Sequence, residues 1–311
     1  MASGVTDRGS GDRLVRVISP DGCFRGLVAV TTGVVRDICA RQHTDLTASV
    51  ALGRLITGGA LMAGLLKGDQ RLSLVIEGNG PIGKIGVEAD AAGRLRGTIR
   101  NPVAGLPPRH ERFDVAGAIG KAGFLTVCKD LGLKKTYRSM VQLQTSEVAE
   151  DLAWYLSSSE QVPSSLGLGV EIDAQARIAA AGGFLIQTLP PENQAKIDDL
   201  ISRIADLPPV TTLLREGTSP EEILERLFAG HGFKVHEQQP LCFFCPCSRT
   251  RIERMLTGLG RAELESLAEQ QATTTVRCEY CAMEYGFSRE QLQQLAGASG
   301  TSAGTRPFAS H

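Results

Sequence analysis

The sequence predicts an α+β fold with an antiparallel-rich N-terminal core domain, a helical metastable linker and a small, cysteine-bearing C-terminal domain. Three observations support this. Short runs with strand-like alternation follow one another directly through the first 190 residues, as in antiparallel sheets. Helix signals and charged residues then dominate 191–240. Finally, five of the eight cysteines lie between Cys242 and Cys281. The expected segments are a disordered N-terminal tail (1–13), the core domain (14–190), the linker (191–240), the cysteine-bearing domain (241–290) and a disordered C-terminal tail (291–311).

The core strands are predicted from alternating apolar residues and from turn signals. Residues 14–18 and 23–31 flank Pro20-Asp21-Gly22, which indicates a hairpin. A long apolar helix over 45–67, capped by Asp45 with Gly68 just past its end, interrupts the strands. Further strands are expected at 72–76, 82–89, 95–100, 124–129, 140–145, 168–172 and 178–188, with a second helix over 146–156.

Composition excludes several classes of protein. The net charge is −1, so no basic field indicates a nucleic-acid or anionic-membrane partner. The first residues contain no apolar segment of the secretory type. The longest apolar stretch, 55–66, contains three glycines and is too short to span a bilayer. A reducing cytoplasmic compartment is therefore expected, where clustered cysteines more often bind metal or react than form structural disulfides.

One segment matches a cofactor fingerprint and is better interpreted as a turn. Residues 78–83, Gly-Asn-Gly-Pro-Ile-Gly, fit the dinucleotide-binding pattern and follow a strand. A second strand is predicted after them, rather than a helix whose N-terminus could bind a pyrophosphate. The three cysteines outside the cluster, Cys23, Cys39 and Cys128, occupy apolar patterns and are expected to pack in the core.

The linker contains one well-specified helix. Ser219 is a good N-cap, Pro220 suits the first helical position, and Glu222 completes a capping box. The helix spans only about ten residues, and isolated helices below ~12–15 residues are marginal in water. It is therefore expected to stay folded only while its apolar face is buried. That face comprises Ile223, Leu224, Leu227 and Phe228, and Gly230 ends the helix.

The clustered cysteines predict a four-thiolate zinc site. Cys242-Phe-Phe-Cys245-Pro-Cys247 is followed by thirty residues and then by Cys278-Glu-Tyr-Cys281. Two short cysteine motifs at such a separation are typical of tetrahedral zinc. Five thiols are available for a metal that takes four, and His236 is close enough to be a substitute, so spacing alone leaves the ligand set open. The spare thiol indicates redox chemistry. About fifty residues bury little apolar surface, so zinc is expected to supply most of their stability.

Two other classes of zinc or thiol protein fit less well. A zinc-ribbon module for nucleic acid would need a basic surface, but 241–290 carry six basic and seven acidic side chains. A thiol–disulfide oxidoreductase using Cys278-Glu-Tyr-Cys281 would need a thioredoxin-like βαβ setting, and the C-terminal position of the motif argues against it.

The cysteine pattern resembles the zinc switch of the redox-regulated heat-shock chaperone family, the 33 kDa chaperonins. Their pattern is C-x-C, a spacer of about thirty residues, then C-x-x-C. The resemblance extends upstream to the Gly78-Asn-Gly80-Pro81 turn and to the Ala-Ala-Gly-Gly segment at 180–183, which is followed by Pro190-Pro191. It covers roughly residues 14–290.

The resemblance implies an ATP-independent holdase rather than an enzyme. The zinc ligands, one zinc per chain in the reduced state, would be Cys245, Cys247, Cys278 and Cys281. The same four cysteines would form two disulfides on oxidation, release zinc and unfold the linker, whose switch residues are Ser219, Ile223, Leu224, Leu227 and Phe228. Cys242 departs from the pattern and is a possible extra thiol. The expected partners are unfolded client proteins, with a homodimer in the oxidised form and neither nucleic acid nor membrane.

Overall fold

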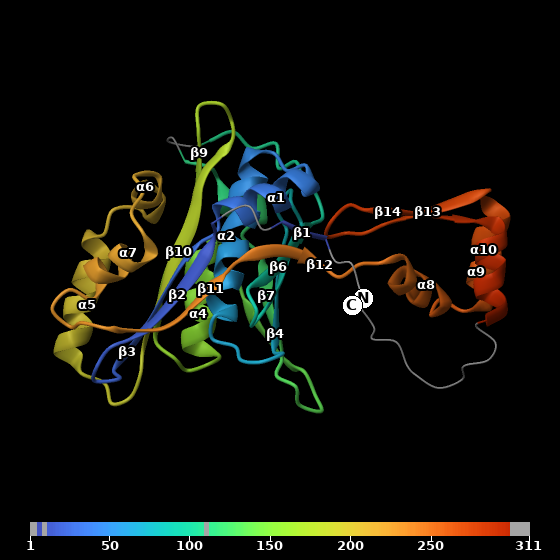
Figure 1. The fold of residues 1–311 in the computed structure, drawn as a ribbon. Coiled ribbons are helices and arrows are strands. Elements are labelled where there is room, and N and C mark those ends of the chain that lie inside the picture. Colours follow the sequence, from blue (N-terminus) through green and yellow to red (C-terminus); the bar gives the residue numbers. More distant parts are fainter. Residues whose placement is uncertain (1–4, 8–10, 109–111, 299–311) are drawn as a thin grey trace. The chain divides into compact units, whose positions relative to one another are not determined.

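The structure, a computed structural model, describes residues 5–7, 11–108 and 112–298 and divides into two compact units (Figure 1). The larger unit spans Thr6–Phe244, and the smaller one contains the chain from Cys245 onward. The mixed α+β class with antiparallel sheets is confirmed. The division between the units falls four residues after the expected start of the cysteine-bearing domain, because strand β12 (Cys242–Cys245) pairs with the larger unit.

Two sheets form the larger unit. Strand β12 pairs with β6 in parallel, and the strand pairs of these two sheets that involve neither β1 nor β12 are antiparallel. The seven-stranded sheet has the order β1 (Val5–Asp7), β12, β6 (Arg94–Ile99), β5 (Lys84–Asp90), β4 (Arg71–Gly78), β7 (Gly123–Asp130), β8 (Tyr137–Gln142). The five-stranded sheet has the order β11 (Lys234–Pro240), β2 (Arg13–Ile18), β3 (Phe24–Val30), β10 (Ile178–Thr188), β9 (Ser164–Ile172).

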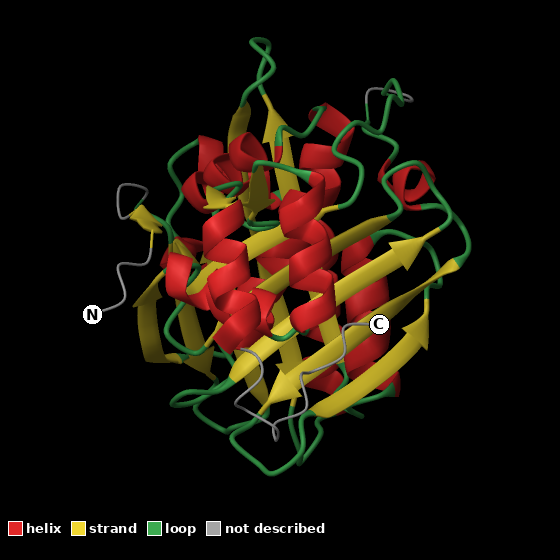
Figure 2. Ribbon diagram, turned by 90° about the vertical axis from the view of Figure 1, so that its right-hand side faces the viewer, coloured by secondary structure: helices red, strands yellow, loops and turns green. Residues whose placement is uncertain are grey.

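Helix α2 (Leu46–Ala63) lies between these two sheets (Figure 1), and Figure 2 shows the layers of helices and strands one behind another. It contacts β4, β5 and β6 on one side and β3, β9 and β10 on the other. The predicted cap is confirmed, since the Asp45 carboxylate accepts a hydrogen bond from the Ala48 N–H at 2.8 Å. By length and composition alone, this helix could cross a membrane. The expectation considered only residues 55–66 and therefore underestimated the length of the apolar segment. In the structure, however, 89% of the helix is buried inside the larger unit, where it forms part of the core.

The predicted strands and turns of the core are largely confirmed. The hairpin around residues 20–22 is β2–β3, and the glycine-rich segment 78–83 is a turn that leads into β5. Gly80 is required there because a Cβ atom would lie 2.4 Å from the Ala118 carbonyl oxygen in helix α3 (Val115–Ile119). The helix expected at 146–156 is α4 (Val148–Ser158). Helix α1 (Thr32–Gln42) was not predicted, because the preceding apolar run reads as a continuing strand.

Three helices of the linker cover the five-stranded sheet (Figure 1). Helix α6 (Val210–Arg215) packs on β9 and β10, and α7 (Pro220–Leu227) packs on β2 and β3, while α5 (Gln194–Asp206) packs on α7. The helical prediction is wrong for the end of the linker, where 234–240 form strand β11 against β2. The segment Lys-Val-His-Glu-Gln-Gln has little apolar alternation of its own, and its strand partner lies more than 200 residues earlier in the chain.

Helix α7 has the predicted N-terminus. The Ser219 hydroxyl accepts a hydrogen bond from the Glu222 N–H at 3.2 Å, and the Glu222 carboxylate accepts one from the Ser219 N–H at 2.6 Å. The four predicted apolar side chains, Ile223, Leu224, Leu227 and Phe228, are at most 1% exposed. Phe228 lies against Gly26 of β3 and makes an edge contact with Phe233, with ring centroids 5.9 Å apart. The helix is therefore held by the sheet that it covers.

The smaller unit contains two helices, a hairpin and a third helix. The segment between the two cysteine motifs forms two helices, α8 (Arg249–Thr257) and α9 (Arg261–Gln270), because Gly258 and Gly260 separate them and Gly260 has a φ of +91°. A small apolar core joins these elements, and Leu264, Phe287 and Leu292 are its most buried members. The elements are α8 (Arg249–Thr257), α9 (Arg261–Gln270), β13 (Thr273–Arg277), β14 (Glu284–Ser288) and α10 (Arg289–Ala298).

The two predicted tails are shorter than expected. Residues 291–298 belong to α10, where Leu292 and Ala296 are buried, and 299–311 lie outside the described residues. Within 1–13, Val5–Asp7 form β1 and Arg13 opens β2, while 1–4 and 8–10 lie outside the described residues.

Candidate metal centre

Four cysteines are placed by two short segments of the smaller unit. Cys245 ends β12, and Cys247 precedes Ser248, the N-cap of α8. Cys278 and Cys281 lie in the turn between β13 and β14. Backbone hydrogen bonds close this turn: the Cys278 N–H donates to the Met283 carbonyl and the Ala282 N–H donates to the Cys278 carbonyl, both at 2.9 Å. Each segment therefore directs two thiols towards one point.

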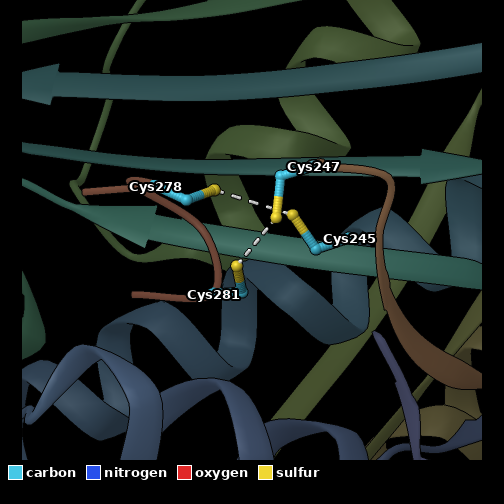
Figure 3. Close-up of side chains that lie close together, drawn as sticks. All are labelled: Cys245, Cys247, Cys278 and Cys281. Carbon is cyan, nitrogen blue, oxygen red and sulfur yellow. Dashed lines mark hydrogen bonds between the residues drawn. The ribbon is translucent and has the colours of Figure 1, made fainter. Parts of the chain in front are cut away.

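The four sulfur atoms of Cys245, Cys247, Cys278 and Cys281 all lie within 4.8 Å of one another (Figure 3). The Sγ–Sγ distance is 3.7 Å between Cys245 and Cys278 and 3.2 Å between Cys247 and Cys281. A disulfide would require about 2.05 Å. A tetrahedral zinc with Zn–S bonds of ~2.3 Å separates its sulfurs by about 3.8 Å. The donor set and its spacing therefore fit a tetrahedral metal ion such as zinc.

The thiols of the cluster differ in pKa. The hydrogen bond with Cys245, followed by the backbone N–H groups of Cys281 and Tyr280, lowers the pKa of Cys278 to about 4. The same thiol–thiolate hydrogen bond, together with burial, raises the pKa of Cys245 above its ordinary value. Burial is the main reason that the pKa of Cys281 is raised to about 11. The cluster is thus arranged to carry a thiolate at Cys278 at neutral pH, which is the form that binds metals.

Tyr285 supports the cluster and was not foreseen from the sequence. Its hydroxyl, on β14, donates a hydrogen bond to the Cys247 sulfur at 3.2 Å. Such hydrogen bonds to ligand atoms orient metal sites and tune their affinity. The only signal in the sequence was a tyrosine four residues after Cys281, which is too common a feature to interpret.

The structure does not bring the other candidate residues into the cluster. Cys242 lies on β12, where it pairs with Arg94 of β6 and its N–H donates to the Gly93 carbonyl. His236 lies on β11, exposed, and is not among the four. The expectation of packed core thiols is confirmed for Cys23 and Cys39, which are buried, whereas Cys128 is only half-buried. Burial raises the pKa of each of these three thiols.

The known proteins that this chain resembles in sequence or in structure carry the same protein name. A family model described as Hsp33 protein matches residues 12–288. The 33 kDa chaperonin of Syntrophotalea carbinolica is 55% identical over 284 residues, which are 91% of this chain and 99% of that protein. The 33 kDa chaperonin of Geobacter sulfurreducens is 54% identical, over 91% of this chain and 94% of that protein. The crystal structure of the 33 kDa chaperonin (heat shock protein 33 homolog) from Thermotoga maritima matches with a TM-score of 0.87 and 34% identity, over 94% of this chain and all of that one.

Proposed function

Because this chain belongs to the Hsp33 family of heat-shock chaperones, we propose that it is a redox-regulated, ATP-independent holdase that prevents unfolded proteins from aggregating under oxidative stress. The observation that carries the proposal is the four-thiol cluster, which brings together two segments of a unit that has only a small apolar core of its own. Stability of that unit then depends on the redox state of four sulfur atoms. A chaperone controlled in this way responds directly to oxidants.

In the reduced protein, Cys245, Cys247, Cys278 and Cys281 hold one zinc ion. When bound, zinc supplies a crosslink between the segment before α8 and the β13–β14 turn, and it keeps its ligands deprotonated. Tyr285 hydrogen-bonds the Cys247 sulfur and holds it towards the other three. Cys242 is not needed for this site, since four thiols already converge without it.

Oxidation removes the ligands. Two thiols and one molecule of hydrogen peroxide give one disulfide and two molecules of water, so the four cysteines consume two molecules of peroxide. Sulfurs joined in disulfides no longer act as thiolate ligands, and the small unit loses the crosslink on which its folding depends. Hypochlorous acid, a two-electron oxidant, does the same with release of chloride and water.

When the small unit unfolds, apolar surface becomes exposed because the linker undocks. Helix α7 buries its apolar face on β2 and β3, and two ion pairs tie the linker to β2: Arg13 with Glu221 at 2.8 Å and Arg16 with Glu237 at 2.7 Å. Undocking of the linker would uncover apolar side chains of the sheet, which would then be available to unfolded clients. These side chains include Val15, Val17, Phe24, Val28, Phe184 and Ile186.

Replacing Ser219 with Ala is expected to destabilise the docked linker by ~0.5–2 kcal/mol, because the variant loses the capping hydrogen bond to the Glu222 N–H. Faster hydrogen exchange over 219–228 in the reduced protein would measure the loss. Ser219→Asp serves as the matched control, since a carboxylate can accept the same hydrogen bond. Exchange that is unchanged in Ser219→Ala would show that the cap does not stabilise the linker.

The oxidised protein is expected to suppress aggregation of a heat-unfolded test protein, and the reduced, zinc-loaded protein to suppress it much less. Light scattering would measure this without ATP, because the sequence contains no GxxxxGK[ST] loop that could bind its phosphates. Zinc content and accessible thiols are measured on the same samples, and both should fall together with oxidation. Equal protection by the two redox forms would contradict the switch, and a requirement for ATP would contradict the holdase.

We further propose that the protein acts in the cytoplasm and forms a homodimer when oxidised. The thiol cluster can serve as a switch only where reductants restore it, as in the cytoplasm. Undocking of the linker frees an apolar sheet surface and leaves β2 without its β11 neighbour, both of which favour association. Sedimentation of the reduced and oxidised proteins at equal concentration tests the dimer.

A further inference from the structure

Strand β8 is the outer strand at one end of the seven-stranded sheet. Among the described residues it pairs only with β7, in a regular register from Tyr137 opposite Lys129 to Gln142 opposite Phe124. The strand contains no proline and no bulge. Natural proteins usually obstruct outer strands with such features, because an open edge can pair with another chain. Neither a proline nor a bulge in β8 therefore prevents an additional strand from pairing here.

The direction of the backbone groups at this edge follows from one hydrogen bond. The Leu143 N–H donates to the Gly123 carbonyl of β7 at 3.0 Å. Since N–H directions alternate along an antiparallel strand, those of Ser139 and Val141 also point towards β7. The N–H and carbonyl groups of Arg138, Met140 and Gln142 consequently point away from the sheet, and the Gln142 carbonyl accepts a hydrogen bond from the Gln144 side-chain amide at 3.0 Å.

Large apolar side chains are exposed around this edge. On the outer face of the sheet, Met140 is 52% exposed and Phe124, on the neighbouring strand, is 51% exposed. Leu133 and Tyr137, in the connection between the two strands and at the start of β8, are exposed as well. Single exposed apolar residues are ordinary, but a group on one hairpin marks an interaction surface.

The same hairpin is basic in a chain that is close to neutral. Residues 131–146 contain Lys134, Lys135 and Arg138 and no acidic residue, whereas the whole chain has a net charge of −1. All three basic side chains are exposed. The charge is complementary to an acidic partner. It also disfavours a second copy of this chain at the edge, because strand pairing would bring two basic hairpins together.

We propose that the β8 edge, defined as Leu133–Gln142, binds an extended acidic and apolar segment of an unfolded client by strand addition. Backbone hydrogen bonds to the outward groups of β8 require no particular client sequence. Met140 and Phe124 accommodate varied apolar side chains, and the basic residues attract acidic ones. The inference rests on the proposed chaperone function but not on its redox step: the edge is exposed while none of the eight cysteines forms a disulfide, so it accounts for the weak protection expected of the reduced form and not for the gain on oxidation.

Met140→Pro is the sharpest test. Proline removes an outward N–H and breaks no hydrogen bond to β7, as expected for proline on an outer strand. The probe is a short, fluorescently labelled peptide that alternates Val or Phe with Glu, and its affinity for reduced full-length protein is measured by anisotropy. Met140→Pro is expected to bind it on the order of tenfold more weakly. Met140→Thr, which keeps the N–H and suits a strand, should lose clearly less affinity than the proline variant.

Two further measurements make the result decisive. Gln142→Pro removes another outward N–H, so it replaces Met140→Pro if circular dichroism shows that the first variant is misfolded. Lys134→Glu/Lys135→Glu should also weaken binding of the acidic peptide, and a peptide with Lys in place of Glu should bind less than the acidic one. Unchanged affinity in a folded proline variant, or equal binding of the Lys peptide, would overturn the proposal.

Other occupants of the edge give distinct outcomes. Single-stranded DNA that competes with the peptide and binds at least as tightly would identify a nucleic-acid surface instead. Conversion of a dimer into a monomer by Met140→Pro would identify a self-interface instead. Failure of the oxidised wild type to suppress aggregation would contradict the proposed redox switch, and peptide binding to the reduced protein would still decide the role of the β8 edge.

Discussion

Chelation of the metal, or replacement of Cys278 with Ser, is expected to unfold residues 245–298 while the two sheets of the larger unit remain folded. The four sulfurs join the start of the small unit to its hairpin turn, and its apolar core is small. Structural zinc contributes ~10–16 kcal/mol of apparent binding free energy at neutral pH. The few buried side chains of the small unit cannot compensate for the loss of that binding free energy. Hydrogen exchange by mass spectrometry should show full exposure of 245–298 and retained protection of β3, β4 and α2.

Cys242→Ser is the matched control, because the same substitution is made three residues before Cys245, outside the four-sulfur cluster. This variant should retain one zinc per chain and normal protection of the small unit. Loss of zinc from Cys242→Ser, or retention of one zinc by Cys278→Ser, would contradict the assignment of the four ligands.

Phe228→Ala is expected to open the linker without any oxidant. The ring is 1% exposed and lies against Gly26, where a Cβ atom would come within 2.7 Å of it. Truncation of a buried phenylalanine costs ~3–5 kcal/mol. Since every 1.4 kcal/mol changes an equilibrium about tenfold, the open population of the linker should rise by roughly two to three and a half orders of magnitude. Reduced, zinc-loaded Phe228→Ala should therefore show fast exchange over 194–240 and measurable suppression of aggregation.

Two variants separate this effect from general destabilisation. Gly26→Ala disturbs the same contact from the sheet side, because the new methyl group would collide with the Phe228 ring, and it should act in the same direction. Ile201→Ala removes an apolar side chain of α5 that is 55% exposed, so it should change little. If residues 194–240 stay protected after oxidation while the protein suppresses aggregation, linker opening is not the activating step.

Local signals in the sequence were sufficient for many elements of the fold. The Pro-Asp-Gly turn fixed the β2–β3 hairpin, and Asp45 and Ser219 marked two helix starts that the structure confirms. The cysteine spacing predicted a four-thiolate site, and the family resemblance indicated which four of the five thiols converge. The turn and the two helix caps depend on residues that lie close together in the chain.

The features that were missed depend on distant partners or on small residues. Strand β11 forms because β2 is available to pair with it, and nothing within Lys234–Pro240 specifies that partner. The apolar spacing between the cysteine motifs continues across Gly258 and Gly260, so it does not indicate that the backbone turns there and that α8 and α9 are separate helices. The Tyr285 hydrogen bond to Cys247 requires the register of the β13–β14 hairpin, which the sequence does not determine.

The order of the elements along the chain has a consequence for synthesis on the ribosome. Four strands of the five-stranded sheet, β2, β3, β9 and β10, precede the linker, and β10 ends at Thr188, 39 residues before the end of α7. At about 5–20 residues per second, that interval lasts roughly 2–8 s. During those seconds the strands that carry the apolar sheet surface have been synthesised, whereas the helices that cover this surface are not yet complete. Each newly made molecule therefore passes through an uncovered form before its thiol cluster exists, and in that form the nearest unfolded polypeptide is the growing end of its own chain.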